Sequence, residues 1–178
     1  MWSASRMPLY AIGDSQPTID PTAFIHPDAV LIGAVTVGAE SSIWPAAVLR
    51  ADHGQIRIGA GTSIQDGTIV HCASTLDTIV GDRCTIGHNA HLEGCTIEDD
   101  CLIGSGSVVL HRAIVRRWAL VGAQALVPND MEVPSGALAV GLPAKIKLGA
   151  ADRVLIEAAA KVYIHNAHWY NAALRRLD

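Results

Sequence analysis

Aliphatic residues recur at a fixed interval of six along the middle of the chain. Seven of them follow one another without a break: Ile97, Ile103, Val109, Val115, Val121, Val127 and Val133. An α-helix repeats about every 3.6 residues and a coiled coil about every 3.5, so neither keeps a six-residue period on one face. Stacked short strands do keep it. The pattern therefore predicts a parallel β-helix in which three hexads make one coil of about 18 residues.

The same interval continues upstream in three shorter sets, which are separated by changes of phase. The sets are Ile43 and Leu49, then Ile58, Ile64 and Val70, then Val80, Ile86 and Leu92. Nine residues separate the first set from the second, ten separate the second from the third, and five separate Leu92 from Ile97. We expect loops or corner irregularities at these slips, which bracket the most polar part of the repeat.

Small residues and glycines repeat in step with the aliphatic ones. The residue four positions after the aliphatic is small at Thr62, Thr68, Cys84, Ala90, Cys101, Ser107, Ala113, Ala119 and Ala125. One bulky and one small inward side chain per strand fit a narrow prism, whose core is completed by stacking. Glycine directly follows the aliphatic where we expect a tight corner that needs a permissive backbone. These glycines are Gly59, Gly81, Gly87, Gly104 and Gly122.

The end of the chain departs from the six-residue pattern. From about Ala150 to Leu177 there is no glycine or proline, and a set of residues falls near a 3.6-residue period: Val154, Leu155, Ala158, Val162, His165 and Trp169. This predicts an amphipathic helix that lies with this face on the β-helix. We expect a β-helix domain over residues 1–149, with a flexible extension at 1–7, and a helix over 150–178 packed on it.

Composition narrows the class of protein. Half of the 178 residues are hydrophobic, the net charge is −4, and no basic run or aromatic platform suggests nucleic-acid binding. No signal peptide or membrane span is recognisable, which predicts a soluble, cytoplasmic protein. Cys84 and Cys101 occupy inward positions and should pack in the core. Cys72 and Cys95 lie beside histidines and could bind metal, although no Cys-x-x-Cys pair exists.

Three of the eight histidines fall within 21 residues in the most polar part of the repeat. His71 follows an inward aliphatic and should point outward, and His88 comes 17 residues later, almost one coil on. The two imidazoles should lie about one strand spacing apart on an outer face, where they could approach a shared ion directly or from neighbouring subunits. His91 and Glu93 flank inward Leu92, so either could supply a third ligand to a catalytic Zn²⁺. The alternative is a set of scattered surface histidines.

Four further polar residues stand beside inward aliphatics in the same two coils: Arg50, Asp52, Gln65 and Asp66. Arg50 could pair with Asp52 and Asp66 and fix a carboxylate network across a subunit boundary. A carboxylate or the glutamine could also orient a metal-bound hydroxide. The alternative is a structural ion-pair ladder, and the two roles are compatible.

An ordered set of motifs resembles the γ-class carbonic anhydrase family. The motifs are Ile43-Trp44-Pro45, Arg50-Ala51-Asp52, Gln65-Asp66-Gly67, His71, Gly87-His88, Gly94-Cys95 and Gly141-Leu142-Pro143-Ala144-Lys145. The resemblance covers the chain from about Pro8 to Lys147. It implies an all-β fold, a left-handed parallel β-helix of hexapeptide repeats with a C-terminal α-helix, and a homotrimer. It also implies Zn²⁺ or Fe²⁺ at each subunit interface, bound by three histidines from two chains.

The resemblance assigns roles by position. The first two histidine ligands of the family correspond to His71 and His88. At the third position the family has a histidine followed by glycine, whereas this chain has Glu93 and a new histidine at His91. We favour His91 as the third metal ligand, because an imidazole preserves the ligand set, and Glu93 is the alternative. The polar residues around the family's site correspond to Arg50, Asp52, Gln65 and Asp66.

The activity implied by the resemblance is the reversible hydration of CO₂ to bicarbonate by a metal-bound hydroxide. Gln65 would help to position the hydroxide, and Glu93, if it is not a ligand, is the nearest proton acceptor. Two other classes share the repeat. A hexapeptide-repeat acyltransferase would bind acyl-CoA in a subunit groove and use one catalytic histidine without metal. A non-catalytic trimeric scaffold or small-ligand binder would keep a metal for assembly.

Overall fold

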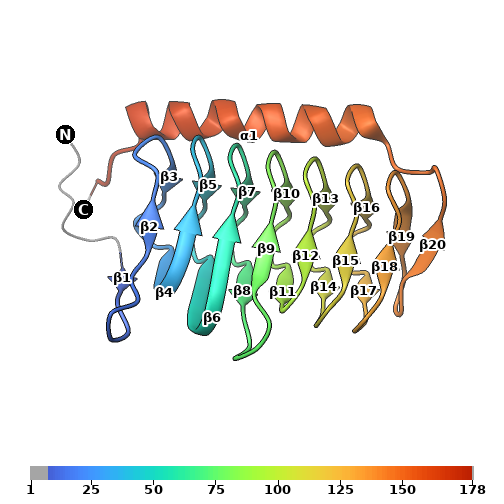
Figure 1. The fold of residues 1–178 in the computed structure, drawn as a ribbon. Coiled ribbons are helices and arrows are strands. Elements are labelled where there is room, and N and C mark those ends of the chain that lie inside the picture. The colour runs from blue at the N-terminus through green and yellow to red at the C-terminus, as the bar shows by residue number, and fades with distance from the viewer. Residues whose placement is uncertain (1–7, 178) are drawn as a thin grey trace.

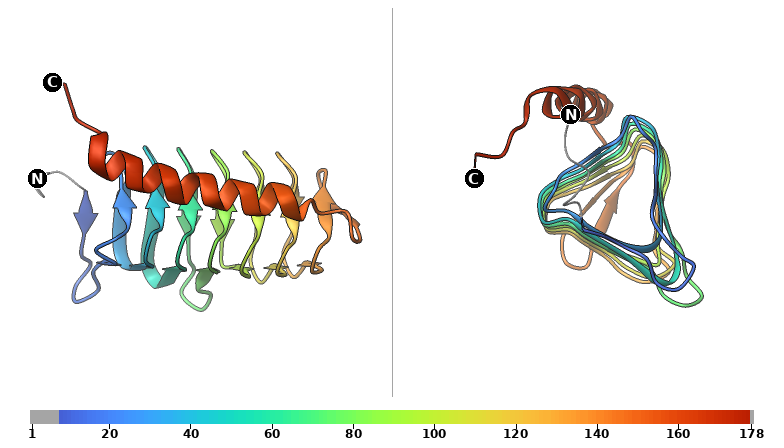
Figure 2. Two further views of the ribbon diagram at one scale, coloured as in Figure 1. Left: turned by 90° about the horizontal axis from the view of Figure 1, so that it is seen from above. Right: turned by 90° about the vertical axis from the view of Figure 1, so that its left-hand side faces the viewer.

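The chain forms a triangular rod of stacked short strands with one long helix along its side (Figure 1). The computed structural model describes residues 8–177. Seen along the axis, each coil is a triangle with three flat faces (Figure 2). The predicted parallel β-helix of hexapeptide repeats with a C-terminal α-helix is confirmed. No helix within residues 8–177 has the length and apolar character needed to span a membrane.

Each face is a ladder of strands from successive coils. The first face holds β1 (Leu9–Tyr10), β8 (Ile69–His71), β11 (His91–Glu93), β14 (Val108–Val109) and β17 (Leu126–Val127). The second face holds β2 (Thr18–Ile19), β9 (Thr78–Val80), β12 (Thr96–Ile97), β15 (Ile114–Val115) and β18 (Glu132–Val133). Two long strands, β4 (Val30–Val37) and β6 (Val48–Ile58), turn the corner between these faces and belong to both.

The third face is a separate sheet. It holds β3 (Phe24–Ile25), β5 (Ser42–Ile43), β7 (Ser63–Ile64), β10 (Thr85–Ile86), β13 (Leu102–Ile103), β16 (Leu120–Val121), β19 (Leu138–Val140) and β20 (Lys145–Lys147). The stacked strands pair in parallel, and β20 pairs antiparallel with β19 at the end of the rod.

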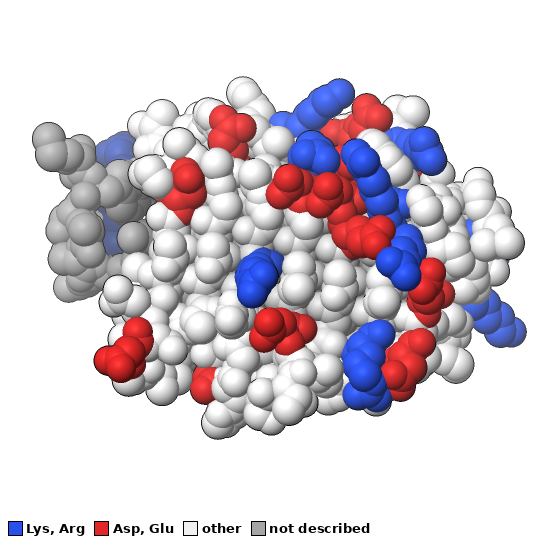
Figure 3. All heavy atoms as spheres, in the orientation of Figure 1, with Lys and Arg blue, Asp and Glu red and all other residues white. Residues whose placement is uncertain are grey.

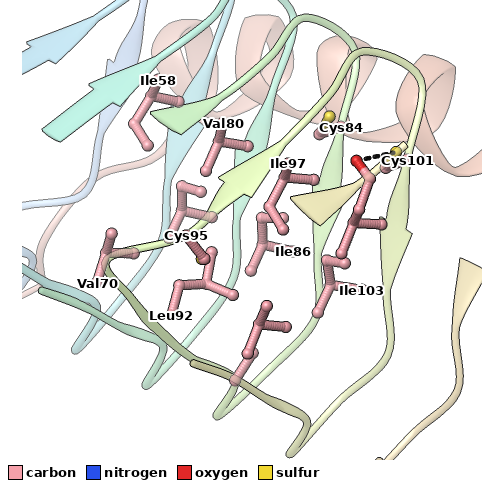
Figure 4. Packing of buried hydrophobic residues seen from close by; sticks show 14 of the residues in the cluster. Ile58, Val70, Val80, Cys84, Ile86, Leu92, Cys95, Ile97, Cys101 and Ile103 are labelled. Atoms are coloured by element: carbon pink, nitrogen blue, oxygen red, sulfur yellow. Dashed lines mark hydrogen bonds between the residues drawn. The ribbon is translucent and has the colours of Figure 1, made fainter. Parts of the chain in front are cut away.

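The core consists of the residues that the six-residue pattern marks as inward. Parallel register places like on like, so that Ile86 lies between Ile64 and Ile103 of the adjacent coils. All nine small residues that the repeat predicts as inward are buried. Figure 4 shows the aliphatic side chains and Cys84, Cys95 and Cys101 directed into this core.

The four cysteines all belong to the core. Cys84 and Cys101 are buried as predicted, and Cys72 and Cys95 are buried as well. Burial raises the pKa of Cys95 to about 12, so this thiol stays protonated at neutral pH. Since metals bind the thiolate, this environment gives no support to cysteine ligation.

The glycines that follow the inward aliphatics serve a different purpose from the one predicted. Positive φ angles occur at other positions, many of them not glycine, such as Asn89 (56°) and Gln124 (56°). Gly104 is needed because an added Cβ would lie 2.4 Å from the backbone nitrogen of Ala123 in the next coil. Gly87 faces the same constraint, with Ser105 N at 2.7 Å. Close approach of coils, rather than corner conformation, selects these glycines.

The three slips in phase are corner features between the first and second faces. In the first slip, β6 continues through the corner without a break. The second is a loop at residues 72–77, closed by a bridge between Ala73 and Leu76. The third is a tight corner in which Gly94 has a φ of 58°. Because the loop adds residues to its coil, aligned positions are 22 residues apart there.

The helix α1 (Arg153–Ala173) begins at Asp152, whose carboxylate accepts a hydrogen bond from the backbone nitrogen of Leu155. It lies along the third face over β3, β5, β7 and β10. The predicted orientation of its apolar face is wrong. The six residues expected to pack on the β-helix are exposed, and Ile156, Ala160 and Ala167 are buried instead.

Aromatic contacts explain the orientation of α1. Tyr170 packs on Phe24 and Trp44, with ring centroids 5.7 and 4.9 Å away, and Tyr163 packs on Trp44 at 5.9 Å. The indole nitrogen of Trp44 donates to the hydroxyls of Ser42 and Ser63, both at 2.9 Å. Residues 156, 160, 163, 167 and 170 also follow a helical period, and this second stripe is the one that meets the ring cluster.

Charged side chains of both signs intermingle over the C-terminal coils (Figure 3). Asp100 lies between Arg83 and Arg117, at 2.7 Å from each, and Arg116 bridges Glu98 and Glu132. These pairs form a ladder across successive coils. Here each of these arginines is paired with at least one carboxylate of a neighbouring coil.

Candidate functional site

One group of predicted residues gathers at the corner between the first and second faces. The register places Arg50, His71 and Glu93 side by side at successive levels, on β6, β8 and β11. All three follow an inward aliphatic and therefore point outward. Arg50 forms an ion pair with Asp52, and His71 Nε2 lies 3.2 Å from Asp52 Oδ1. The pairing of Arg50 with Asp52 is confirmed.

The Glu93 carboxylate is surrounded by imidazoles. Its Oε1 lies 3.1 Å from His71 Nδ1 and 3.4 Å from His111 Nε2, and its Oε2 lies 3.2 Å from His91 Nε2. Desolvation raises the pKa of Glu93, but hydrogen bonds from His71 and His91, with the nearby imidazole of His111, lower it to about 2. The predicted outward orientation of His91 and Glu93 on either side of buried Leu92 is confirmed.

Sequence reasoning missed His111. It is the second residue after β14, in the coil that follows Glu93. The 17-residue coil of this region gives a signal that could have found it, because one coil beyond Gly94 is His111. The two are in contact: a Cβ added to Gly94 would lie 2.9 Å from His111 Cδ2.

A second group gathers at the corner between the third and first faces. His88 Nδ1 lies 2.9 Å from Asp66 Oδ2, and the two residues occupy equivalent turns after β10 and β7. Gln65 precedes Asp66 and is buried. Burial, with a smaller contribution from the charge of Asp66, raises the pKa of Tyr163 on α1. Within one chain Asp66 thus faces His88.

The expected placement of His71 and His88 one strand spacing apart is wrong for a single chain. The loop at residues 72–77 lengthens that coil, so the residue opposite His71 is Glu93. His88 instead sits five residues before Glu93, at the other end of β11. An extended strand rises about 3.3 Å per residue, so the corners lie roughly 10 Å or more apart.

The side chains at these corners have the donor chemistry that a metal ion requires. Both ring nitrogens of His71 face carboxylate oxygens, Asp52 Oδ1 at 3.2 Å and Glu93 Oε1 at 3.1 Å. The Nε2 of His111 is buried and has no hydrogen-bond partner. Imidazoles and a carboxylate are ligands that Zn²⁺ accepts, so the chemistry fits. Within residues 8–177 of one chain, however, no three His, Cys, Asp or Glu side chains are placed to hold a metal.

The first face between the two corners carries an apolar ladder on its outer side. Register aligns the outward residues Val48, Ile69, His91, Val108 and Leu126 on consecutive strands. All are partly solvent-accessible, and Ile69 is 37% exposed. Four aliphatic side chains and one imidazole thus form a mainly apolar strip between the two polar corners.

Comparison with known proteins places the chain among relatives of the same architecture. Residues 77–111 match the family described as bacterial transferase hexapeptide (six repeats). The chain is 42% identical over 167 residues to γ carbonic anhydrase 2, mitochondrial, of Arabidopsis thaliana, which covers 89% of this chain and 60% of that protein. It therefore spans less than two thirds of the length of that relative.

Two further relatives match along most of their own length. Carnitine operon protein CaiE of Escherichia coli (strain K12) is 42% identical over 146 residues, covering 82% of this chain and 74% of that protein. The crystal structure of a hexapeptide transferase family protein from Anaplasma phagocytophilum is 36% identical, with a TM-score of 0.88, and the match covers 93% of this chain and 99% of that one. The chain belongs to the hexapeptide-repeat β-helix proteins of the γ-carbonic anhydrase family.

Proposed function

We propose that the protein is a γ-carbonic anhydrase-like metalloenzyme that hydrates CO₂ reversibly to bicarbonate, as a cytoplasmic homotrimer with its sites between subunits. The observation that carries this proposal is the separation of the two polar corners across the first face. One corner presents His71, His91 and Glu93, and the other presents His88. Each corner alone is incomplete, and each carries residues that match the family's site.

Three-fold symmetry supplies the missing half. A cyclic trimer joins unlike patches of neighbouring subunits, so the His88 corner of one chain meets the Glu93 corner of the next. The apolar ladder through Ile69 and Val108 would then be covered at the centre of the assembly. Exposed aliphatic strips of this kind are typical of subunit interfaces.

The residues named in the sequence divide into roles at this composite site. His71 and His88 from two chains, with His91 or Glu93, would hold Zn²⁺ or Fe²⁺, which when bound lowers the pKa of a coordinated water towards neutrality. Asp52 contacts His71 Nε2 and would orient its ring. Gln65 and Asp66 lie next to His88 and would position the attacking water and the bicarbonate. Glu93, where it is not a ligand, would accept the proton.

Mixed trimers test the composite site directly. His71→Ala and His88→Ala proteins should each retain the fold and lose CO₂ hydration in a stopped-flow assay. When the two variants are unfolded and refolded together, some interfaces pair an intact His71 with an intact His88. Random assembly would restore about a quarter of the sites. Recovery of activity supports the proposal, whereas absence of recovery in a confirmed mixed trimer contradicts it.

Metal content gives the second test. Anaerobically purified protein should contain about one Zn or Fe per chain by elemental analysis. Stoichiometric metal without CO₂ hydration would favour a trimeric scaffold or another hydrolase in place of a carbonic anhydrase.

Acyl transfer is the second candidate, favoured by the similarity to a hexapeptide transferase family protein. It requires acyl-CoA binding in a groove between subunits and a histidine that acts without metal. Equilibrium binding of acetyl-CoA by calorimetry distinguishes it, because a carbonic anhydrase site has no use for the nucleotide moiety. The imidazole-rich surroundings of Glu93 weigh against this alternative.

A further inference from the structure

We propose that His111 is a positioning residue of the metal site, which fixes the Glu93 carboxylate through its Nε2. The inference rests on the proposed function and adds to it a residue outside the ligand positions of the family resemblance. His111 Nε2 lies 3.4 Å from Glu93 Oε1, the same oxygen that His71 Nδ1 contacts at 3.1 Å.

The packing around the imidazole restricts where its ring can lie. Gly94 leaves room for the ring, since a Cβ there would come within 2.9 Å of His111 Cδ2 and 3.0 Å of Leu76 Cβ. Leu76 belongs to the loop at residues 72–77 and Gly94 to the tight corner, so two of the three phase slips meet at Gly94, beside this imidazole. The absence of a side chain at Gly94 leaves space for the ring edge next to Glu93.

Among the described residues, the Nε2 atom of His111 has no hydrogen-bond partner that competes with Glu93. His111 Nε2 is shielded from solvent and makes no hydrogen bond of good geometry, and Glu93 Oε1 is within ion-pair distance. A small rotation of the carboxylate would complete the bond. Side chains that hold a ligand in this way commonly affect metal affinity by 10–100-fold although they do not touch the metal.

The contact also accounts for the departure of this chain at the third ligand position. A glutamate side chain is flexible, and its carboxylate group can rotate about the terminal bond. Imidazoles on both sides, His71 and His111 at Oε1 and His91 at Oε2, leave it one orientation. The Glu93 carboxylate is thereby held in a fixed position toward the His88 corner of the neighbouring chain in the proposed trimer.

Zn²⁺ affinity of the full chain tests the inference. The variants are His111→Leu, which keeps bulk and removes Nε2, and His111→Gln, which keeps a donor near that position. His165→Leu, on the exposed side of α1, is the matched control. Competition with a chromogenic chelator should show affinity about 10–100-fold weaker for His111→Leu, close to that of the unsubstituted protein for His111→Gln, and unchanged for the control. A merely structural role would lower the melting temperature and leave affinity unchanged.

The outcomes separate this inference from the proposed function. If the unsubstituted protein binds Zn²⁺ and His111→Leu binds it equally well, the inference is overturned and the proposed function stands. If the unsubstituted protein binds no metal, the proposed function fails. In that case ¹⁵N NMR of the imidazoles tests whether His111 Nε2 contacts Glu93. Glu93→Gln should then shift the His111 Nε2 resonance, while Asp66→Asn should not. An unmoved resonance overturns the inference, and this arm does not depend on His111 variants that fold.

Discussion

At the scale of single residues, carboxylates on the outside of this rod meet two kinds of cation. Asp100 lies between two arginines, whose guanidinium groups stay charged at every accessible pH. Glu93 is faced by imidazoles, whose ring nitrogens can donate a hydrogen bond or bind a metal ion. The first arrangement is suited to holding coils together, and the second is suited to binding a cation.

The pH dependence of stability should report the surroundings of Glu93. Desolvation alone would raise the folded-state pKa of Glu93. Hydrogen bonds from His71 and His91, with the nearby imidazole of His111, outweigh it and give a folded-state pKa of about 2, against an ordinary value of 4.5. A lowered pKa stabilises the folded state above the ordinary value, and the gain is lost as the pH falls through the folded-state value. Urea unfolding should show the stability difference between the unsubstituted protein and Glu93→Gln shrinking between about pH 4.5 and pH 2. A difference that persists unchanged at pH 2 would contradict this.

At the scale of elements, the six-residue period predicts strand positions because it reports burial directly. Leu92, Ile97 and Ile103 are all buried, in agreement with the pattern. The period carries no information about the contents of a loop, and for that reason the displacement of His88 from His71 was not predictable. The position of His111 could have been found, because it lies one 17-residue coil beyond Gly94. Contacts at the corners depend on how many residues each slip adds.

The helix shows a different limit. Two apolar stripes overlap on α1, and both follow a helical period, so the sequence does not say which one packs. The choice is made by residues far away in the chain, Phe24 and Trp44, which offer rings to Tyr163 and Tyr170. Long-range aromatic packing of this kind leaves no mark on the local pattern.

Substitution of the two stripes should have unequal effects. Ile156 is 1% exposed, and Ile156→Ala should destabilise the fold by about 2–5 kcal/mol through loss of burial and cavity formation. Val162 is 53% exposed, and Val162→Ala should change the free energy of unfolding by about 0.5 kcal/mol or less. Chemical denaturation of both variants checks this. A larger cost for Val162→Ala than for Ile156→Ala would mean that α1 packs through the other stripe.

The two classes of glycine can be separated in the same way. Gly104→Ala drives a methyl group into the backbone of Ala123 and should cost about 1–3 kcal/mol. Gly106 has a φ of 68°, but Asn89 occupies the equivalent corner of the preceding coil at 56°, so Gly106→Asn should cost about 1 kcal/mol or less. The denaturation midpoint should therefore be lower for Gly104→Ala than for Gly106→Asn. The reverse order would mean that backbone conformation, and not the close approach of coils, selects glycine after the inward aliphatic.

At the scale of the whole molecule, the triangular section separates functions by face and corner. The third face is covered by α1, and the C-terminal coils of the rod carry the arginine–carboxylate ladder. The first face carries the apolar ladder, with a polar corner at each edge. Under the proposed function these corners are the two halves of one site, and a rotation about an axis parallel to the rod would join them and cover the ladder.

A charge placed on the apolar ladder should therefore break the assembly without unfolding the chain. Ile69 lies at the middle of the ladder, next to His91, so Ile69→Lys would bury an unpaired ammonium between subunits and weaken association by about 2 kcal/mol or more. Ile114 points outward from the second face and supplies the matched control, because Ile114→Lys adds the same charge away from the ladder.

Sedimentation should show trimers for the unsubstituted protein and the control, and monomers at low concentration for Ile69→Lys, with circular dichroism unchanged in all three. Zn²⁺ binding should fall together with the trimer, since His88 reaches the Glu93 corner only from a neighbouring chain. Monomers that bind zinc as tightly as trimers would show instead that one chain completes the site on its own.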